Sequence, residues 1–129
     1  MKFNDNQPIF IQIADYVGEK ILSRELLTDQ QIPSVRELAV QLEVNPNTVM
    51  RAFERLQSSG IVYNKRGMGN FVAPGAYEKI MEERKTKLIK EVLPGIFEEM
   101  RLLGITETEL LQHYKSCIKK SSSNPQTEE

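Results

Sequence analysis

The chain has 129 residues, which is long enough for one compact domain with an appendage and too short for two full-sized domains. Apolar residues make up 40% and charged residues 27%, a balance typical of a soluble globular protein and not of a fibre or a membrane protein. The net charge of −1 is low for a nonspecific phosphate binder, so charge has to be judged locally. Residues 51 to 72 carry four cations against one acid: Arg51, Arg55, Lys65 and Arg66 against Glu54.

The sequence shows no targeting segment and no catalytic pattern. The polar residues 1 to 5 lead into neither a signal peptide nor a membrane span, so we expect a cytoplasmic protein that does not bind membranes. The single cysteine, Cys117, cannot form an internal disulfide, and with the single histidine, His113, it cannot build a tetrahedral metal site. An enzyme would need a convergent nucleophile, base or metal set, so we expect no catalytic activity, cofactor or metal ion.

The first two helices are predicted by apolar spacing and by capping residues. Pro8 suits a first helical turn, and apolar residues recur at every fourth position over residues 8 to 23: Ile9, Ile13, Val17 and Ile21. Ser34 and Glu37 form an S-x-x-E capping box, in which each side chain satisfies a free backbone donor. A second helix is therefore expected over residues 35 to 42.

A third helix follows after a short connection. Asn45 is a favourable N-cap and Pro46 a favourable first residue, which predicts a helix from residue 46 to about residue 59. Its inward stripe is apolar and consists of Val49, Ala52, Phe53 and Leu56. Helical periodicity then places Asn47 and Arg51 on the opposite face, where they could contact DNA bases. Two helices joined by so short a turn have the proportions of a helix-turn-helix.

The next segment has the pattern of a β-hairpin. Residues 61 to 65 and 70 to 73 are β-prone, and the glycines of the Arg66-Gly-Met-Gly69 segment permit a tight turn. Such a hairpin would form a wing, with Lys65 and Arg66 at its tip and with Gly67 and Gly69 allowing close approach to a sugar-phosphate strand. A charged hairpin that merely keeps a sheet edge soluble is the alternative.

The remaining residues are predicted to be helical. Apolar residues recur at helical spacing from residue 76 onward, Pro94 is expected to break or kink this run, and Gly104 is expected to end it. Thr106 and Glu109 form a second capping box and open a last helix. Residues 121 to 129 are polar and are expected to be disordered.

Two further features bear on DNA binding. Arg36 lies in the first turn of the second helix, where such motifs cross the DNA backbone, although a surface ion pair would also explain it. On the third helix, an ordinary solvated face with an Arg51 and Glu54 ion pair is the alternative to a DNA-contacting face. The preceding capped helix favours the DNA-contacting interpretation.

Residues 8 to 72 resemble the GntR family of bacterial regulators through the motifs PIFIQIADYV, IPSVRELAVQLEVNPNTVMRAFERLQSSGIV and KRGMGNFV. The helical run that follows resembles the YtrA-type branch, whose short C-terminal helices dimerise. The resemblance implies a repressor-like regulator, and the YtrA-type branch implies control of nearby transporter genes. Residues that match the family's DNA-contacting positions are Arg36, Asn45, Asn47, Thr48, Arg51 and the wing from Arg66 to Gly69.

The sequence departs from the family pattern at several positions. Arg24 replaces a usual glycine, Thr28-Asp29 stands for a common Pro-Gly, and Glu43 stands for glycine in the turn between the second and third helices. We expect modest backbone strain at Glu43. Pro46 replaces a frequent basic residue and so removes one DNA contact that the resemblance implies.

The sequence as a whole predicts a mostly α-helical protein with a small β-hairpin. Residues 1 to 75 would form a winged helix-turn-helix that binds double-stranded operator DNA, and residues 76 to 120 a helical dimerisation region, because its apolar stripe is too long for one small domain to bury. A homodimer would contact a pseudo-palindromic operator with half-sites roughly 34 Å apart. An effector molecule is left open, since no ligand motif is visible. A winged domain that binds another protein instead of DNA is the alternative, which the modest net charge would fit.

Overall fold

The computed structural model describes residues 2 to 120 of the chain. The chain divides into two compact units, Met1–Lys85 and Thr86–Glu129, which we call the first unit and the second unit. The mostly helical fold with one β-hairpin is confirmed. The predicted disordered tail, residues 121 to 129, lies outside the described residues.

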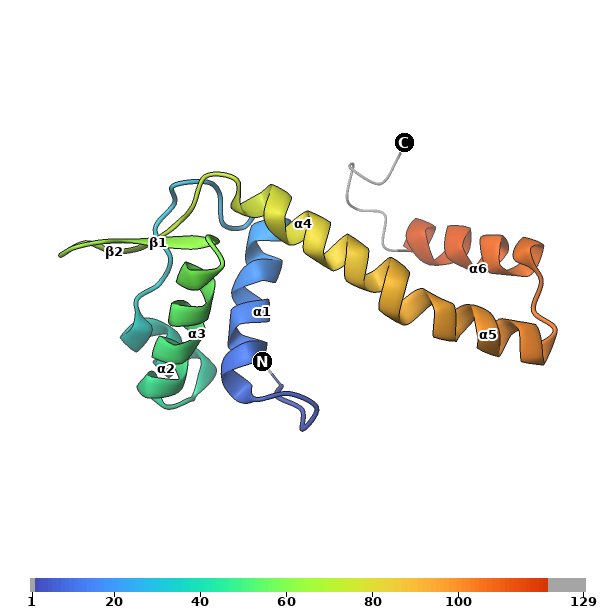
Figure 1. The fold of residues 1–129 in the computed structure, drawn as a ribbon, viewed down its shortest axis with the longest axis horizontal. Helices are drawn as coiled ribbons and strands as arrows, with labels where there is room; N and C mark the ends of the chain where they lie inside the picture. The colour runs from blue at the N-terminus through green and yellow to red at the C-terminus, as the bar shows by residue number, and fades with distance from the viewer. Residues whose placement is uncertain (1, 121–129) are drawn as a thin grey trace. The chain divides into compact units, whose positions relative to one another are not determined.

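Three helices form the body of the first unit (Figure 1): α1 (Ile9–Leu22), α2 (Val35–Leu42) and α3 (Pro46–Ser58). The α3 helix packs against both α1 and α2. The α4 helix (Ala76–Lys87) follows the hairpin and contributes Ala76 and Ile80 to the same core. The stripes predicted from the sequence form this core, which includes Ile13, Val17 and Ile21 of α1, Leu38, Ala39 and Leu42 of α2, and Val49, Ala52, Phe53 and Leu56 of α3.

Capping residues determine where α2 and α3 begin. The Ser34 hydroxyl accepts a hydrogen bond from the Glu37 backbone N–H at 3.1 Å, and the Glu37 carboxylate accepts one from the Ser34 N–H at 2.9 Å. The predicted capping box is therefore confirmed. These bonds lower the pKa of Glu37 below its ordinary value, mainly through the backbone N–H of Ser34. At α3, the Asn45 side chain accepts from the Asn47 N–H at 2.8 Å.

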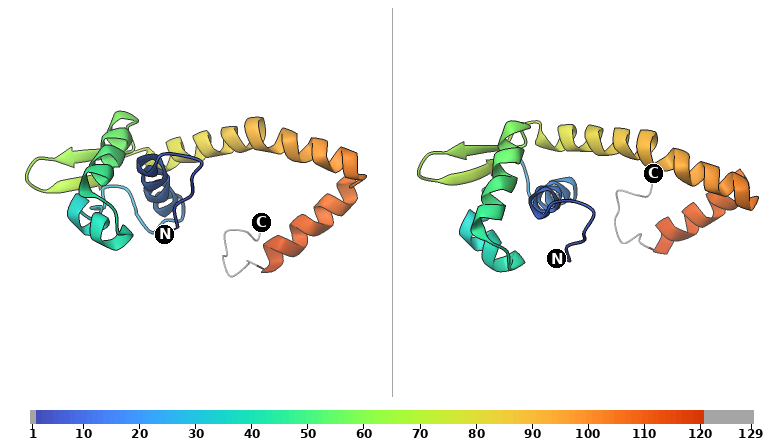
Figure 2. Two further views of the ribbon diagram at one scale, coloured as in Figure 1. Left: turned by 90° about the horizontal axis from the view of Figure 1, so that it is seen from below. Right: turned by 60° about the horizontal axis from the view of Figure 1, so that its bottom comes forward.

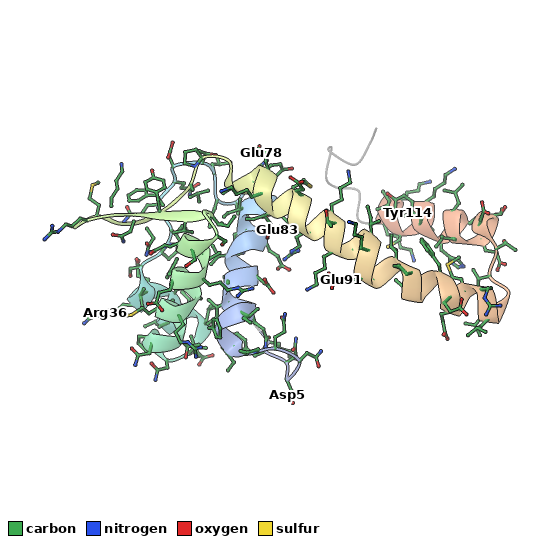
Figure 3. The ribbon with its side chains drawn as sticks, in the orientation of Figure 1. Asp5, Arg36, Glu78, Glu83, Glu91 and Tyr114 are labelled. Atoms are coloured by element: carbon green, nitrogen blue, oxygen red, sulfur yellow. The ribbon has the colours of Figure 1, made fainter. Side chains whose placement is uncertain are left out.

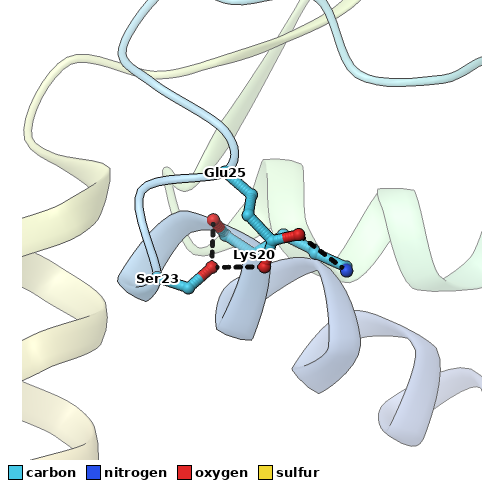
Figure 4. Close-up of polar contacts among 3 residues, drawn as sticks. All are labelled: Lys20, Ser23 and Glu25. Carbon is cyan, nitrogen blue, oxygen red and sulfur yellow. Dashed lines mark hydrogen bonds and ion pairs between the residues drawn. The ribbon is translucent and has the colours of Figure 1, made fainter. Parts of the chain in front are cut away.

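A small polar cluster closes the C-terminal end of α1 (Figure 4). The Ser23 hydroxyl lies 2.7 Å from a Glu25 carboxylate oxygen and 3.1 Å from the Lys20 carbonyl oxygen. The Lys20 ammonium lies 3.1 Å from the other Glu25 oxygen. The Ser23 hydroxyl, followed by the Lys20 ammonium, lowers the pKa of Glu25. Ser23 and Glu25 are the sequence neighbours of Arg24, whose backbone is left-handed with φ of 68°.

The hairpin consists of β1 (Val62–Lys65) and β2 (Gly69–Val72), which pair antiparallel with Val62 opposite Val72. On its other side, β2 bonds to the segment before α2, where the Ile32 N–H donates to the Asn70 carbonyl at 2.8 Å. Three lengths of chain therefore run side by side at the base of the hairpin. The hairpin turn extends beyond the helices of the first unit (Figure 2).

The second unit contains a π-helical turn (Leu88–Val92), α5 (Leu93–Leu103) and α6 (Glu107–Lys120), and residues 104 to 106 connect the last two. Pro94 lies in the first turn of α5. Of the predicted break or kink, the break does not occur, because the chain is helical on both sides of Pro94. The π-helical turn directly precedes α5. Proline has no backbone N–H to donate, and we infer that the wider π-helical turn accommodates this missing donor within the helical run. Gly104 ends α5 in a left-handed conformation, and Thr106 and Glu109 form the predicted cap.

No residue of the second unit is buried among those that the structure describes. Its large apolar side chains are exposed along all three segments: Leu88, Ile89, Val92, Ile96, Phe97, Leu102, Leu103, Ile105, Leu110, Leu111 and Tyr114. Over residues 2 to 120, no helix combines the length and apolar character needed to cross a membrane.

Candidate nucleic-acid interface

The α3 helix has one buried face and one exposed face, as predicted. Val49 is fully buried and Phe53 nearly so, at 0% and 3% exposure, with Ala52 and Leu56 beside them in the core. Asn47 and Arg51 are exposed. The core therefore anchors α3 along one side and leaves the side that carries Asn47 and Arg51 free for contact with another molecule.

Two further predicted site residues, Asn45 and Thr48, lie at the start of α3. The Asn45 side-chain oxygen is taken up by the cap on the Asn47 N–H, which leaves its amide group as the available donor. Thr48 is half-buried. Asn45 is the N-cap of α3 and Thr48 lies in its first turn, and both are close in sequence to the exposed Asn47.

Arg51 lies against an aromatic ring of α1. Its guanidinium carbon is 4.1 Å from the centroid of the Phe10 ring, which is the geometry of a cation–π contact. The ion pair between Arg51 and Glu54, which belonged to the alternative interpretation of this face, is not among the ion pairs found in residues 2 to 120. Phe10 was not identified from the sequence, because no motif spacing connects residues 41 positions apart. The contact orients the guanidinium, whose charge has no acidic partner in the part of the chain that the structure describes.

Arg36 lies in the first turn of α2 and is exposed. Figure 3 shows its side chain directed away from the helices of the first unit, on the side toward which the hairpin extends. Within the described part of the chain, no ion pair involves any candidate cation of this surface: Arg36, Arg51, Arg55, Lys65 or Arg66. The alternative interpretation of Arg36, a surface ion pair, is therefore not supported.

The tip of the hairpin combines exposed charge with left-handed glycines. Gly67 and Gly69 have φ of 78° and 120°, conformations that L side chains rarely adopt. A Cβ at Gly67 would meet open space. Glycine is therefore favoured there by the positive φ of the backbone and not by a lack of room for a side chain. Lys65 and Arg66 are exposed, and the Lys65 ammonium lies 5.0 Å from the centroid of the Phe71 ring. The tip therefore presents two cations on a narrow turn.

Aromatic and polar contacts hold the base of the hairpin. The rings of Tyr63 and Phe71 stack with centroids 5.6 Å apart across the strand pair. The Tyr63 hydroxyl donates a hydrogen bond to the Asp29 carboxylate at 2.8 Å, and this bond raises the pKa of Tyr63. Asp29 lies in the segment before α2, so the contact ties β1 to that segment.

Three non-glycine residues of the first unit have a left-handed backbone. They are the three positions for which the resemblance noted in the sequence implies glycine: Arg24 with φ of 68°, Asp29 with φ of 64° and Glu43 with φ of 55°. The strain expected at Glu43 is confirmed by its left-handed conformation at the C-cap of α2. Arg24 and Asp29 gain side-chain contacts there, since the Arg24 guanidinium lies 3.6 Å from the centroid of the Tyr77 ring.

The described residues contain no group of three or more His, Cys, Asp or Glu side chains arranged to hold a metal ion. Cys117 and His113, which the sequence singles out, both lie on α6 in the second unit and are exposed. The side chains that the first unit brings together are cations, amides and glycines. Such groups bind phosphates and base edges.

Comparison with known proteins identifies the family of the chain. The model of the family described as "Bacterial regulatory proteins, gntR family" matches residues 11–72. The chain is 42% identical to the HTH-type transcriptional regulator YhcF of Bacillus subtilis over 115 residues, covering 89% of this chain and 93% of that protein. It is 34% identical to the HTH-type transcriptional repressor YtrA of Bacillus subtilis over 98 residues, covering 76% and 75% of the two chains.

Solved structures show the same architecture. A transcriptional regulator of the GntR family from Bacteroides thetaiotaomicron matches with a TM-score of 0.71 at 42% identity, covering 89% of this chain and all of the other. AraR(DBD) in complex with operator ORR3 matches with a TM-score of 0.52 at 32% identity, covering 57% of this chain and 88% of the other. The chain therefore belongs to the GntR family, and its winged helix-turn-helix is the DNA-binding domain of a transcriptional regulator.

Proposed function

We propose that the protein represses transcription by binding as a homodimer to a pseudo-palindromic operator. The α3 helix (Pro46–Ser58) enters the major groove with Asn47 and Arg51 toward the base edges. Arg36 contacts a phosphate at the groove entrance, and Asn45 and Thr48 support the first turn of α3. The hairpin tip, from Lys65 to Gly69, lies along the adjacent backbone or minor groove.

One observation carries this proposal. The exposed face of a helix that is capped and anchored by the core bears a guanidinium that has no acidic partner among residues 2 to 120, and further cations without such a partner in that range lie on α2 and on the hairpin. Unpaired cations add nothing to stability through ion pairs, whereas they gain counterion-release energy when they meet phosphates. The operator complexes of AraR support the same use of the fold.

The second unit supplies the dimer in this proposal. Its exposed apolar side chains, among them Phe97 at 49% exposure and Leu111 at 51%, form an uncovered surface on α5 and α6. A second copy that covers it would place two α3 helices on half-sites about one helical turn apart, roughly 34 Å. The name of the repressor YtrA supports repression, and the resemblance to that branch extends the proposal to transporter genes near its own gene.

The proposal is tested by selecting genomic fragments with the full chain and measuring an electrophoretic shift on the best fragment. We expect Arg51→Ala to weaken operator binding by about 1 to 3 kcal/mol per half-site, because a bidentate base contact is lost. Ser58→Ala serves as a control on the same helix. Dimerisation should not change in either variant. Loss of the contact between Arg51 and the Phe10 ring should lower the free energy of unfolding by at most about 1 kcal/mol.

The alternative function gives a different result. If the winged domain binds another protein, no genomic fragment is enriched, and Arg51→Ala leaves any residual DNA binding unchanged. Operator affinity that falls steeply as salt rises would support phosphate contacts by the unpaired cations. Affinity that is independent of salt would contradict the proposed interface.

A further inference from the structure

A chain of side-chain amides connects the hairpin to α3. Asn70 on β2 is 9% exposed, and its side-chain oxygen accepts two hydrogen bonds. The Gln57 amide of α3 donates one at 3.0 Å, and the Asn64 amide of β1 donates the other at 3.2 Å. The Asn64 amide also lies 3.3 Å from the Gly69 carbonyl oxygen. Gln57 therefore reaches from the C-terminal half of α3 onto the hairpin.

A second amide holds the hairpin from its other edge. The Gln31 side chain, in the segment before α2, donates to the Met68 carbonyl at 2.7 Å. A Cβ at Gly69 would lie 3.0 Å from the Gln31 amide nitrogen, so glycine at this position lets that side chain reach the turn. The hairpin is thus bonded on one side to α3 and on the other to the segment that leads into α2.

We propose that Gln57, Asn70 and Gln31 are positioning residues for DNA binding, because they fix the angle between the wing and α3. The inference rests on the proposed function and adds to it a device that makes both elements meet the same half-site. A two-stranded ribbon is marginally stable by itself and twists easily. Holding the wing in place before binding removes an ordering cost that would otherwise lower the affinity.

Loss of the Gln57 side chain should affect the position of the wing more than the stability of the fold. Gln57 is exposed, so its loss opens no cavity in the core. Without Gln57, the buried oxygen of Asn70 still accepts a hydrogen bond from Asn64. No buried polar group is left without a partner, so the loss of stability should not exceed the net worth of one neutral hydrogen bond.

The test uses Gln57→Met in the full chain, since methionine keeps the length and helix propensity of glutamine and lacks the donor. We expect operator affinity to fall about fivefold per half-site, about the worth of one neutral hydrogen bond, and thus about 25-fold for a dimer. Ser58→Ala, the control on α3, should bind as the wild type does. The backbone amide of Met68 should become more mobile in Gln57→Met, seen as a lower heteronuclear NOE.

A double-variant cycle distinguishes positioning from direct contact. In a Lys65→Ala, Arg66→Ala background the wing has lost its charges, so Gln57→Met should lower affinity by less than twofold. An equal loss in both backgrounds would show that Gln57 contacts DNA itself and would overturn the inference, as would no loss in either. Wild-type protein that enriches no fragment would instead overturn the proposed function, which the wild-type measurement detects by itself.

Discussion

The two units of the molecule differ in how they treat their apolar side chains. In the first unit, α1, α2, α3 and the start of α4 share one core, in which Ile13 and Val49 are fully buried. In the second unit, Phe97 is 49% exposed and Tyr114 is 61% exposed, and no described residue is buried. The first unit thus has a core of its own, whereas the described residues of the second unit leave their large apolar side chains exposed.

This difference shows where each unit obtains its stability. Helices of 11 and 14 residues such as α5 and α6 are marginal in water when they bury nothing. The first unit needs no partner to bury its stripes, so its surface is free for DNA. Four substitutions break or sharpen this comparison, and they follow in order of expected effect.

Phe53→Ala should produce the largest loss of stability. Phe53 is 3% exposed and lies in the core of the first unit, so its truncation leaves a cavity. We expect the free energy of unfolding to fall by about 3 to 5 kcal/mol in a denaturant titration. A loss below about 1 kcal/mol would contradict the closed core of the first unit.

Phe97→Ser should act on assembly instead of on the fold of the first unit. If a second copy covers α5 and α6, loss of this aromatic anchor weakens dimerisation by about 2 kcal/mol, or about 30-fold in the dissociation constant. Sedimentation equilibrium measures this constant. Glu99→Ser, on the same helix, is the matched control and should dimerise normally. Equal dimerisation by all three proteins would show that the uncovered surface is not the dimer interface.

Ser34→Ala should have a smaller effect, confined to the start of α2. It removes the hydroxyl that accepts the Glu37 N–H at 3.1 Å. Loss of such an N-cap costs about 1 kcal/mol of unfolding free energy. Thermal unfolding followed by circular dichroism would detect it, and an unchanged midpoint would show that the cap contributes nothing.

Glu43→Gly should have the smallest effect, and in the opposite direction. Glu43 has φ of 55° at the C-terminal end of α2, where a left-handed backbone and a negative charge are both unfavourable. Glycine relieves both and loses part of the gain to chain entropy, so we expect about 0.5 kcal/mol of added stability. Asp29→Gly is the comparison variant and should not stabilise, because Asp29 accepts the Tyr63 hydroxyl.

Local patterns in the sequence predict the elements of the first unit well. The capping box at Ser34 and the cap at Asn45 each mark a helix start within a few residues of sequence, and both are confirmed. Contacts between distant residues could not be predicted in this way. Gln57 bonds to Asn70 across 13 positions and Gln31 to Met68 across 37, and no spacing rule connects them.

The local signal at Pro94 was also incomplete. Proline removes one donor, which predicts a break or a kink, but the sequence does not show that a π-helical turn (Leu88–Val92) directly precedes α5. Among the candidate site residues, periodicity correctly places Asn47 and Arg51 on the exposed face of α3. It does not reveal the ring of Phe10 beneath the Arg51 guanidinium, because that contact depends on how α1 packs against α3.

The central claim is that the exposed face of α3 and the tip of the hairpin contact operator DNA together. Titrating isotope-labelled protein with the selected operator, and following each backbone amide by NMR, tests it most directly. The account predicts the largest shifts at Asn47, Arg51 and residues 66 to 69, with small shifts along α1. Shifts concentrated on α5 and α6, with α3 unchanged, would contradict it.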